Sequence, residues 1–581
     1  MENRDIARIL YETADLMEIG SEDGFRIRSY RNAAQSIETS PARIYDIVCK
    51  PDQRIADKEL LALPGIGKNM VSHLREICAT GDLRLHQELL QKFPPGALEM
   101  LHIQGLGPKG IALIWSAYRA STIDELEKLC REGQIRKLPR MGEKLEQRIL
   151  KSIEAYRRSA GRFLLSAAER AADDVIAHLR QGPDAASLRV TAAGSLRRGK
   201  ETIGDLDILV TGGKPNPQIE HMLRYGKVTD VVARGENKLS VKLPQALQVD
   251  VRFLEPGSYG AAMQYFTGSK EHNVVLRQRA IRMGYKLSEY GLFRTSDESR
   301  VAGASEEEIY ATLGLDFIPP ELRENSGEID AAERHALPRL IEIEDIKGDL
   351  HVHTTESDGR VPMEEMAEAA RARGLQYIAI TDHSKALAMT NGLNEERVIA
   401  QAKKIRELNQ RIEGFRLLAG IEVDIHRDGR LDLEDEALAR LDIVVASVHS
   451  YFNLDPAEMT ERLLRAFENP YLNVLAHPTG RQLLSREPYA FDFDRVLAEA
   501  ARRKIALEIN SSPERLDLSE LNARRARERG VKIVISTDSH HPKHLPNLRY
   551  GVKMARRAWL APADVLNTLP AEEFLKAIAR R

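Results

Sequence analysis

The pattern of apolar and polar positions changes character twice along the chain. In the first 160 residues apolar side chains recur at three-to-four spacing, as at Ile6 and Leu10, which predicts amphipathic helices. From about 186 to 253 apolar positions alternate or run together between glycines and prolines, which predicts β-strands. After about residue 346 seven short apolar runs alternate with helical stretches, as in a parallel (β/α) barrel. We therefore expect several domains of different fold classes.

Three short turn signals recur within the helical region. They read LPGIGK at 63–68, IQGLGPK at 103–109 and LPRMGEK at 138–144. We interpret them as copies of a helix–hairpin–helix unit, the third degenerate because Arg140 replaces a glycine. In such a turn, residues without a Cβ let backbone amides approach a DNA phosphate, which positions a duplex without reading its sequence. The candidate DNA-binding residues of these turns are Gly65, Gly67, Lys68, Gly105, Gly107 and Lys109.

Acidic residues interrupt the predicted strands of the middle region. Asp205 and Asp207 lie two apart in GDLDILV, so both side chains leave the same face of a strand. Adjacent carboxylates repel each other unless a divalent cation lies between them, and hard oxygen ligands suit Mg²⁺. A third carboxylate, Asp250, stands alone in the apolar run QVDVRFL, where burial without a counter-ion is costly. The three residues therefore indicate a metal site.

A candidate phosphate-binding turn precedes the first two aspartates. Gly194 and Ser195 of GSLRRG offer a flexible turn and a hydroxyl, and Arg198 offers a guanidinium, a combination that suits a triphosphate. Acidic pairs on strand ends and Gly-Ser turns are each common in ordinary proteins. Their joint occurrence indicates two-metal phosphoryl or nucleotidyl transfer.

Histidines and carboxylates lie at or just beyond the ends of most apolar runs after residue 346. Barrel active sites are built at the carboxyl ends of the strands, so we expect these side chains to converge. Imidazole and carboxylate together suit Zn²⁺, Mn²⁺ or Fe²⁺ better than Mg²⁺, and metal-bound hydroxide attacking phosphorus is the natural chemistry. The residues, enough for three ions, are His351, His353, Asp358, His383, Glu422, His449, His477, Asp538 and His540.

Composition and charge narrow the way in which this protein could bind nucleic acid. The chain has 581 residues, 85 of them Lys or Arg and 87 Asp or Glu, for a formal charge of −2. This balance excludes a polycation that holds DNA by bulk charge. No run resembles the ~18 apolar residues of a membrane span. Three well-separated cysteines are typical of reduced thiols in a cytoplasmic protein.

The middle and N-terminal motifs resemble the family X DNA polymerases, the polymerase beta type. The resemblance covers residues 1 to about 330 and rests on GSLRRG, GDLDILV, VDVRF and YFTGS. It implies that Asp205, Asp207 and Asp250 hold two Mg²⁺ or Mn²⁺ ions. It further implies that Ser195, Arg198 and Gly204 contact the triphosphate of the incoming nucleotide. By the same resemblance, Tyr265 and Phe266 pack against its sugar, and Asn273 and Arg277 approach the minor-groove side of the nascent base pair.

The segment GFRIRSYRNAA at 24–34 resembles the start of the same family's small N-terminal domain. There a basic pocket takes the 5′-phosphate of a gap, and Arg26, Arg28 and Arg31 are the candidates, a solvated helix face being the alternative. Several relatives form a Schiff base with a lysine after the first hairpin, a position that is His73 in this chain. Since imidazole cannot form the imine, we expect this lyase activity to be absent or to use another amine.

The C-terminal motifs resemble the PHP (polymerase and histidinol phosphatase) family of metal-dependent phosphoesterases over about 346–575. The resemblance identifies the nine histidines and carboxylates given above as the ligands of up to three Zn²⁺, Mn²⁺ or Fe²⁺ ions. Arg481, just past His477, is a candidate for binding the scissile phosphate. A PHP fold kept as a structural brace is the alternative, and the intact ligand set argues against it.

These resemblances imply a multidomain fold with helical helix–hairpin–helix domains, an α+β nucleotidyltransferase palm and a C-terminal (β/α)7 PHP barrel. The expected domains are a first helical domain (1–85), a second with the other hairpins (86–160), the palm (161–264), a nucleotide-selecting subdomain (265–330), a linker (331–345) and the PHP domain (346–581).

The combined architecture is that of bacterial and archaeal family X polymerases. It implies a monomeric, cytoplasmic repair enzyme that fills gaps in primer-template DNA with dNTPs and contacts no membrane. Its barrel would supply a 3′→5′ exonuclease, with cleavage at abasic sites as a further activity, in base-excision repair. Two alternatives stay open: a barrel that acts as a phosphatase or pyrophosphatase, and a gap-binding scaffold with weak catalysis.

Overall fold

We describe a computed structural model of the chain, which covers residues 1, 3–39, 43–93, 96–103, 105–159, 161–387 and 390–579. The chain divides into two compact units, residues 1–160 and 161–581, and each is described by itself. Among the residues covered, no helix is both long and apolar enough to cross a membrane.

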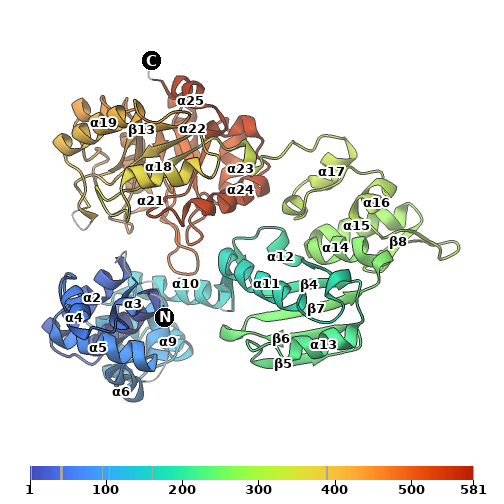
Figure 1. Ribbon diagram of the computed structural model, residues 1–581, viewed down its shortest axis with the longest axis horizontal. Coiled ribbons are helices and arrows are strands. Elements are labelled where there is room, and N and C mark those ends of the chain that lie inside the picture. Colours follow the sequence, from blue (N-terminus) through green and yellow to red (C-terminus); the bar gives the residue numbers. More distant parts are fainter. Residues whose placement is uncertain are drawn as a thin grey trace. The chain divides into compact units, whose positions relative to one another are not determined.

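All regular secondary structure among the described residues of the first unit is helical (blue to cyan in Figure 1). Apolar side chains at helical spacing gather in one core, and the predicted periodicity is seen in Ile6 and Leu10, which are both fully buried. The helices are α1 (Asn3–Ile19), α2 (Gly24–Thr39), α3 (Ile44–Val48), α4 (Gln53–Leu61), α5 (Lys68–Thr80), α6 (Arg84–Lys92), α7 (Gly96–Glu99), α8 (Pro108–Tyr118), α9 (Ile123–Arg131) and α10 (Glu143–Ser159).

The three predicted hairpin turns share one backbone conformation. Gly65 and Gly105 adopt φ of +73° and +95°, in the left-handed region that favours glycine. Arg140, at the same place in the third turn, adopts φ of +65°. The third copy thus keeps the turn geometry although its sequence is degenerate, at a strain of about 1–2 kcal/mol for a residue with a Cβ. The helices α5, α8 and α10 begin directly after these turns.

The second unit begins with the expected α+β palm. Its five-stranded sheet has the order β2 (Arg189–Ala192), β4 (Asp205–Thr211), β7 (Gln248–Leu254), β6 (Lys238–Lys242) and β5 (Asp230–Arg234). Only β4 and β7 run parallel, and their pairing places Asp207 directly opposite Asp250. The helices α11 (Leu165–Leu179) and α13 (Pro215–Leu223) pack on the sheet, so one face carries a core and the carboxylates leave from the other. A short pair of strands, β1 (Phe163–Leu164) and β3 (Thr202–Ile203), flanks it.

A smaller subdomain follows the palm. It holds α14 (Tyr259–Thr267), α15 (Lys270–Arg282), a three-stranded antiparallel sheet of β8 (Tyr285–Ser288), β9 (Gly291–Arg294) and β10 (Arg300–Ala302), and the helices α16 (Glu306–Thr312) and α17 (Glu328–Glu333). The expected boundaries at 264/265 and 330/331 fall inside α14 and α17, and the boundary at 85/86 falls inside α6. Within the expected linker, Ala332 and Ile341 are fully buried.

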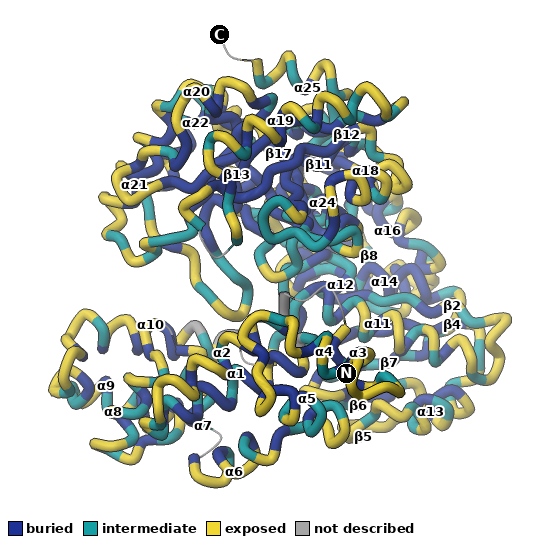
Figure 2. The backbone as a smooth tube through the Cα atoms, turned by 60° about the vertical axis from the view of Figure 1, so that its left-hand side comes forward, coloured by how far each residue is buried: buried dark blue, intermediate teal, exposed yellow. Residues whose placement is uncertain are grey.

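The C-terminal region is a seven-stranded parallel barrel, as the alternating pattern predicted. The strands follow chain order, and a bridge between Val352 and Ser539 joins the last to the first. In Figure 2 the strands β11, β13 and β17 are buried along their length, while the surrounding helices expose their outer faces. The strands are β11 (Gly348–Val352), β12 (Tyr377–Ile380), β13 (Arg416–Asp424), β14 (Ile443–Ser447), β15 (Val474–Leu475), β16 (Ala506–Asn510) and β17 (Ile533–Ser536).

Helices connect these strands and cover the barrel. They are α18 (Met363–Arg371), α19 (Glu395–Asn409), α20 (Asp435–Leu438), α21 (Pro456–Ala466), α22 (Phe493–Arg503), α23 (Glu520–Glu528), α24 (Leu548–Arg557) and α25 (Ala571–Ile578). Inward-facing apolar residues fill one end of the barrel, and Phe574 of α25 stacks on Tyr377 there, with ring centroids 5.6 Å apart. Polar ligand-type residues can therefore gather only at the other end, where the strands finish.

Candidate nucleotide site and metal centre

The three aspartates of the palm lie side by side on two neighbouring strands. Asp205 and Asp207 leave the same face of β4, and Asp250 stands in register with Asp207 on β7. Asp205 is exposed, whereas Asp207 is half-buried beneath the turn that precedes it. Burial, together with the charges of Asp205 and Asp250, raises the pKa of Asp207 to about 6. Crowded carboxylates of this kind are the donors that a divalent cation prefers, so the residues fit Mg²⁺ or Mn²⁺.

Asp250 already has cationic neighbours. Lys238 Nζ lies 3.2 Å from its Oδ2, and a guanidinium nitrogen of Arg252 lies 3.8 Å away. Burial alone would raise the pKa of Asp250, but hydrogen bonds from Ser240 and Gln248 and the charge of Lys238 hold it below its usual value. Among the residues described, the oxygens of the three aspartates are not a group lying entirely within 4.8 Å.

The turn before β4 approaches the aspartates very closely. Gly194 has φ of +62°, and a Cβ built there would lie 2.5 Å from Asp207 Oδ2. Ser195 follows on α12 (Gly194–Arg197), and Gly204 directly precedes β4. The Arg198 guanidinium does not point into open solvent: its Nε donates to Glu324 at 3.0 Å and its Nη1 to the Thr267 carbonyl at 2.7 Å. The turn therefore requires glycine at position 194. The Arg198 guanidinium is already paired with Glu324 in this structure.

The predicted sugar and base contacts lie on α14 and α15. The rings of Tyr265 and Phe266 meet edge to face at 5.1 Å, and Arg252 lies over the Phe266 ring at 4.4 Å. The Asn273 amide is buried and donates to the Tyr265 carbonyl at 2.6 Å, so its side chain holds the YFTGS turn. Arg277, one helical turn later, donates to the Asn273 carbonyl at 3.3 Å.

In the first unit, the hairpin glycines meet the requirements for phosphate contact. A Cβ at Gly67 or Gly107 would meet no atom of the described chain within 4 Å, so the turns face open space at these positions. Lys68 is exposed, and Lys109 is also exposed with only a distant carboxylate, that of Glu18, 3.8 Å away. Backbone amides and two lysines are thus accessible at the hairpins.

The three arginines of the expected 5′-phosphate pocket differ in their surroundings. Arg31 pairs with Asp15 at 2.7 Å and with Glu18 at 2.5 Å, so much of its charge is already compensated. Arg26 pairs with Glu22 at 2.8 Å on the surface, and Arg28 lies over the exposed ring of Phe25 at 4.5 Å. Of the three, Arg26 and Arg28 are more available to a ligand.

His73 occupies a partly buried position beside a tyrosine. Its Nδ1 lies 3.1 Å from the Tyr30 hydroxyl, and the two rings stack with centroids 5.5 Å apart. Burial lowers the pKa of His73. His73 therefore packs against Tyr30, and the expectation about the lyase activity stays a prediction.

The nine predicted ligands of the barrel converge at the carboxyl ends of the strands. Three groups each have ligand atoms within 4.8 Å of one another. His353 belongs to two of the groups and so does His383, so neighbouring groups share ligand residues. The groups are His353, Asp358, His383 and His540; His351, His353 and Asp538; and His383, Glu422 and His449.

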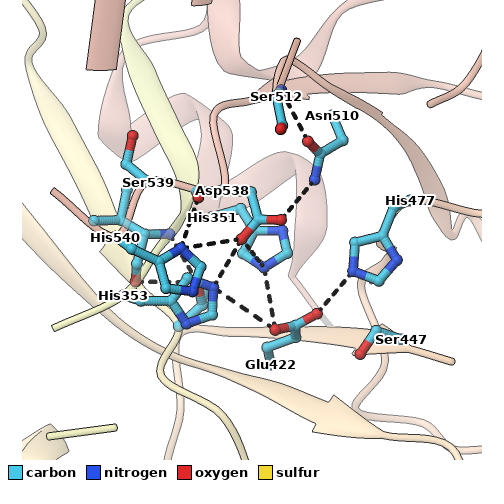
Figure 3. Close-up of polar contacts among 12 residues, drawn as sticks. His351, His353, Glu422, Ser447, His477, Asn510, Ser512, Asp538, Ser539 and His540 are labelled. Carbon is cyan, nitrogen blue, oxygen red and sulfur yellow. Dashed lines mark hydrogen bonds and ion pairs between the residues drawn. The ribbon is translucent and has the colours of Figure 1, made fainter. Parts of the chain in front are cut away.

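His477 completes the cluster through a carboxylate. Its Nε2 lies 3.0 Å from Glu422 Oε1, and Figure 3 shows the two side chains in direct contact. On the opposite side, Asp538 lies 3.1 Å from His353 Nε2 (Figure 3). All nine residues predicted from the sequence therefore lie in one cluster.

Buried ligand atoms in this cluster lack hydrogen bonds of acceptable geometry. Among the residues described they include His353 Nδ1 and Nε2, His351 Nε2, His383 Nδ1 and Glu422 Oε2. Unpaired buried polar atoms are costly, and several facing each other are typical of a metal site. The donor set of imidazoles and carboxylates therefore fits divalent cations of the Zn²⁺, Mn²⁺ or Fe²⁺ kind.

Opposite charges hold the cluster together. Burial disfavours protonation of His383, yet Glu422 and Asp358 raise its pKa to about 10. By contrast, burial and the neighbouring His540 and His383 lower the pKa of His353 to about 3. Metal binding to such a site must displace protons, so it depends on pH.

Several supporting residues were missed by the sequence analysis. Glu508 is fully buried on β16; its Oε1 lies 2.8 Å from His351 Nδ1, and its Oε2 accepts the His477 backbone N–H at 2.7 Å. Asn510, two residues on, donates to Asp538 at 3.1 Å (Figure 3). Such partners fix the orientation of ligands. The signal was present, because Glu508 stands alone in the apolar run IALEIN just as Asp250 does in QVDVRFL.

The arginine predicted to bind a scissile phosphate is directed elsewhere. Arg481 pairs with Glu201 of the palm at 2.7 Å and donates to the backbone carbonyls of Arg515 and Leu516. Arg515 instead has its Nε 3.7 Å from Asp538 Oδ2, at the edge of the metal cluster. The structure therefore places a different arginine beside the ligands.

Four family models match segments of the chain. They are a helix-hairpin-helix domain at residues 1–83, a SAM-like helix-hairpin-helix tandem at 97–155, a DNA polymerase beta thumb at 262–324 and a PHP domain at 349–512. They agree with the helical hairpins, the subdomain after the palm and the barrel described above.

Known proteins match the whole chain or one part of it. A probable phosphatase of Thermoanaerobacter sp. (strain X514) is 32% identical over 247 residues, which is 40% of this chain and 96% of that protein. A crystal structure of Leishmania infantum polymerase beta in a ternary P/T complex covers 39% of this chain and 98% of its own, at 22% identity and a TM-score of 0.27. The DNA polymerase/3′-5′ exonuclease PolX of Bacillus subtilis (strain 168) is 36% identical over 581 residues, 99% of this chain and all of that one. This end-to-end match shows that the chain belongs to the PolX family of DNA polymerase/3′-5′ exonucleases.

Proposed function

We propose that the protein is a template-directed DNA polymerase that fills short gaps in DNA repair and carries a 3′→5′ exonuclease in its barrel. The observation that carries this proposal is the co-occurrence, in a chain similar to PolX over its full length, of the palm triad and the nine-residue cluster. A scaffold with weak catalysis would not need both sets of side chains.

In the palm, the chain's own residues would orient the reacting groups. Asp205, Asp207 and Asp250 would hold two Mg²⁺ or Mn²⁺ ions, which supply charge stabilisation for attack of the primer hydroxyl on the α-phosphate. The turn at Gly194 offers an approach that a larger residue would block, with the Ser195 hydroxyl beside it.

Nucleotide selection would come from the neighbouring subdomain. Arg198 would move from Glu324 to the triphosphate, a charge-assisted contact of the same kind. The aromatic pair Tyr265 and Phe266 would crowd a 2′-hydroxyl and so favour deoxynucleotides. Asn273 would act by holding the Tyr265 carbonyl, and Arg277 would approach the minor-groove side of the new pair.

In the barrel, the three groups of ligands would hold up to three Zn²⁺, Mn²⁺ or Fe²⁺ ions, which supply a nucleophilic hydroxide. Glu508 orients His351, and Asn510 orients Asp538, so the ligands are set before a cation binds. We propose Arg515, rather than Arg481, as the cation that receives the scissile phosphodiester, because it lies beside the cluster. Cleavage at abasic sites could use the same centre.

A phosphatase barrel is the second candidate. It is favoured by one observation, the similarity of the barrel region to a protein named as a probable phosphatase over 96% of that protein's length. Release of inorganic phosphate from a monoester without shortening of a primer would support it. Liberation of nucleoside monophosphates from a DNA 3′ end supports the exonuclease.

We propose gapped or primer-template DNA and dNTPs as the partners, and a monomer acting in the cytoplasm. The exposed hairpin amides beside Lys68 and Lys109 would bind backbone phosphates, and Arg26 with Arg28 would take the 5′-phosphate of a gap. Because the chain has a formal charge of −2, we expect moderate, strongly salt-dependent affinity focused on gaps rather than on duplex length.

One experiment tests both activities. A gapped, 5′-phosphorylated duplex with a labelled primer is incubated with Mg²⁺ or Mn²⁺, with and without dNTPs. We expect extension with dNTPs and shortening without them. The double substitution Asp205→Ala and Asp207→Ala should abolish extension and leave shortening, and His353→Ala should do the reverse. Extension that survives the first change rules out the palm assignment, and shortening that survives the second rules out the barrel assignment.

A further inference from the structure

The loop that follows the candidate phosphate-binding turn is held by the barrel. Residues 198, 200 and 201 contact barrel side chains, although at least 280 positions separate the partners in sequence. The contacts are Arg557 Nη1 to the Arg198 carbonyl at 2.8 Å, Lys200 Nζ to Glu520 Oε1 at 3.5 Å, and Arg481 Nη2 to Glu201 Oε2 at 2.7 Å. At Gly199, with φ of +66°, an added Cβ would lie 3.3 Å from Lys553 Cβ. The barrel thus contacts three of the four residues of this loop and leaves little room for a side chain at the fourth.

Arg557 lies at the centre of these contacts. It is at the end of α24, its side chain is 2% exposed, and it also donates to Glu324 at 3.0 Å and to Glu520 at 2.9 Å. A buried guanidinium that donates to two carboxylates and a carbonyl is held in one position. Its removal is costly, because it leaves buried acceptors without their donor. Burial alone would raise the pKa of Glu520, but Arg557 and Lys200 hold it at about 2, so the pair stays ionised.

Arg557 and Arg198 share one carboxylate. Glu324 Oε1 accepts from Arg198 Nε at 3.0 Å and from Arg557 Nη1 at 3.0 Å. The charge of Glu324 is therefore divided mainly between the two arginines, with Lys200 Nζ farther away at 3.8 Å. If Arg557 is lost, Glu324 interacts more strongly with Arg198 and the Arg198 backbone loses its hydrogen bond. Both changes would keep the Arg198 guanidinium away from a nucleotide.

We propose that Arg557, a residue of the PHP barrel, is a positioning residue of the polymerase site: it fixes loop 198–201 and satisfies Glu324, so that Arg198 can leave Glu324 for the triphosphate. This inference rests on the proposed function, in which Arg198 binds the triphosphate. It assigns the barrel a role in nucleotide binding that is separate from its metal centre, because none of Arg557, Glu520 and Glu324 belongs to the ligand groups.

The test is single-nucleotide gap filling by the full-length chain, with KM for the dNTP and kcat determined separately. Arg557→Ala should raise KM about tenfold with kcat within about twofold of wild type, the pattern of lost binding rather than lost chemistry. Arg557→Lys, which keeps a cation and a donor, should restore part of the affinity. Exonuclease activity of both variants should match wild type, which shows that the barrel is folded.

A matched control lies one residue earlier on the same helix. The Arg556 side chain is 14% exposed, against 2% for Arg557, but it also carries several contacts: it pairs with Glu321 at 2.8 Å and reaches Ile341 and Glu342. All three partners lie outside loop 198–201. Arg556→Ala should therefore leave the KM for dNTP unchanged while removing a barrel contact of comparable size. Equal KM increases in Arg556→Ala and Arg557→Ala would mean that general loosening of the barrel is responsible, and would overturn the proposal.

A second variant keeps the proposal testable if Arg557→Ala does not fold. Glu520→Gln removes one of the two carboxylate charges that hold Arg557 and also the charge that pairs with Lys200 of the loop. The loop should therefore loosen, and KM should rise in the same direction by a smaller factor. An unchanged KM in a folded Arg557→Ala or, failing that, in Glu520→Gln overturns the proposal. Failure of the proposed function looks different: extension would then survive Asp205→Ala with Asp207→Ala, whatever Arg557 does.

Discussion

The close approach of Gly194 to Asp207 gives a sharp prediction, because one added methyl group at Gly194 should disable the palm. An added Cβ would lie 2.5 Å from Asp207 Oδ2, whereas ordinary van der Waals contact begins near 3.4 Å. The turn or the carboxylate must therefore shift by about 0.9 Å. The positive φ of +62° adds about 1–2 kcal/mol of backbone strain. Asp207 has little room to yield, because its neighbours on the strand, Leu206 and Ile208, are fully buried.

A shift of this size lies directly at the metal-binding and triphosphate-binding atoms. Misplacement by ~1 Å costs about a hundredfold in rate, or roughly 2.7 kcal/mol of barrier. We expect Gly194→Ala to lower kcat/KM for single-nucleotide gap filling by about that factor, while exonuclease activity stays at the wild-type level. Gly226→Ala is the control, since a Cβ there meets no described atom within 4 Å. A Gly194→Ala enzyme that keeps kcat/KM within about threefold of wild type would refute the reasoning.

Three further predictions concern other parts of the chain. His353→Ala removes a ligand that two groups share, so the metal content per chain, measured by plasma mass spectrometry, should fall by more than one ion; an unchanged content contradicts the shared site. Gly107→Val adds a side chain in open space at an ordinary φ of −104°, so the melting temperature should hold while DNA binding weakens about fivefold, for about 1 kcal/mol of lost amide contact. Equal DNA affinity of Gly107→Val and wild type would exclude a contribution of this hairpin to DNA binding. Glu520 has a pKa of about 2 in the folded chain, below its ordinary value of 4.5. Its carboxylate therefore contributes its full stabilisation above about pH 4.5, and this contribution is lost as pH falls toward 2. The melting-temperature difference between wild type and Glu520→Gln should thus be largest at pH 7 and shrink by pH 3.5, and a constant difference would contradict this.

The sequence predicts the members of both sites better than their partners. Asp207 and Asp250 could be assigned because each interrupts an apolar strand, and strand pairing then placed them opposite each other. Nine ligands could be assigned because parallel strands bring their carboxyl ends together. In both cases a short local pattern, repeated on adjacent strands, determines the geometry.

Contacts between distant elements carry no such local pattern. Arg481 follows His477 by four residues, and this proximity suggested a phosphate ligand, but its guanidinium pairs with Glu201 of the palm. Arg198 has a triphosphate-binding motif around it, yet in the structure it pairs with Glu324, 126 positions away. An arginine on a loop can reach several carboxylates, and only the packing of elements that are distant in sequence decides which one it meets.

The palm and the barrel also share an apolar core, which bears on why the two activities occur in one chain. The barrel region is similar to a probable phosphatase that is covered by the match over 96% of its own length. In this chain, however, Tyr550 and Val552 of α24 join the same buried cluster as Leu165 and Ile203 of the palm region. The Tyr550 hydroxyl donates to Glu169 of α11 at 2.8 Å. Separating the barrel would therefore expose apolar surface as well as the donors that fix loop 198–201. The barrel is thus part of the scaffold of the polymerase site, and a chain that lost the exonuclease ligands would still need the α24 face to keep its affinity for nucleotides.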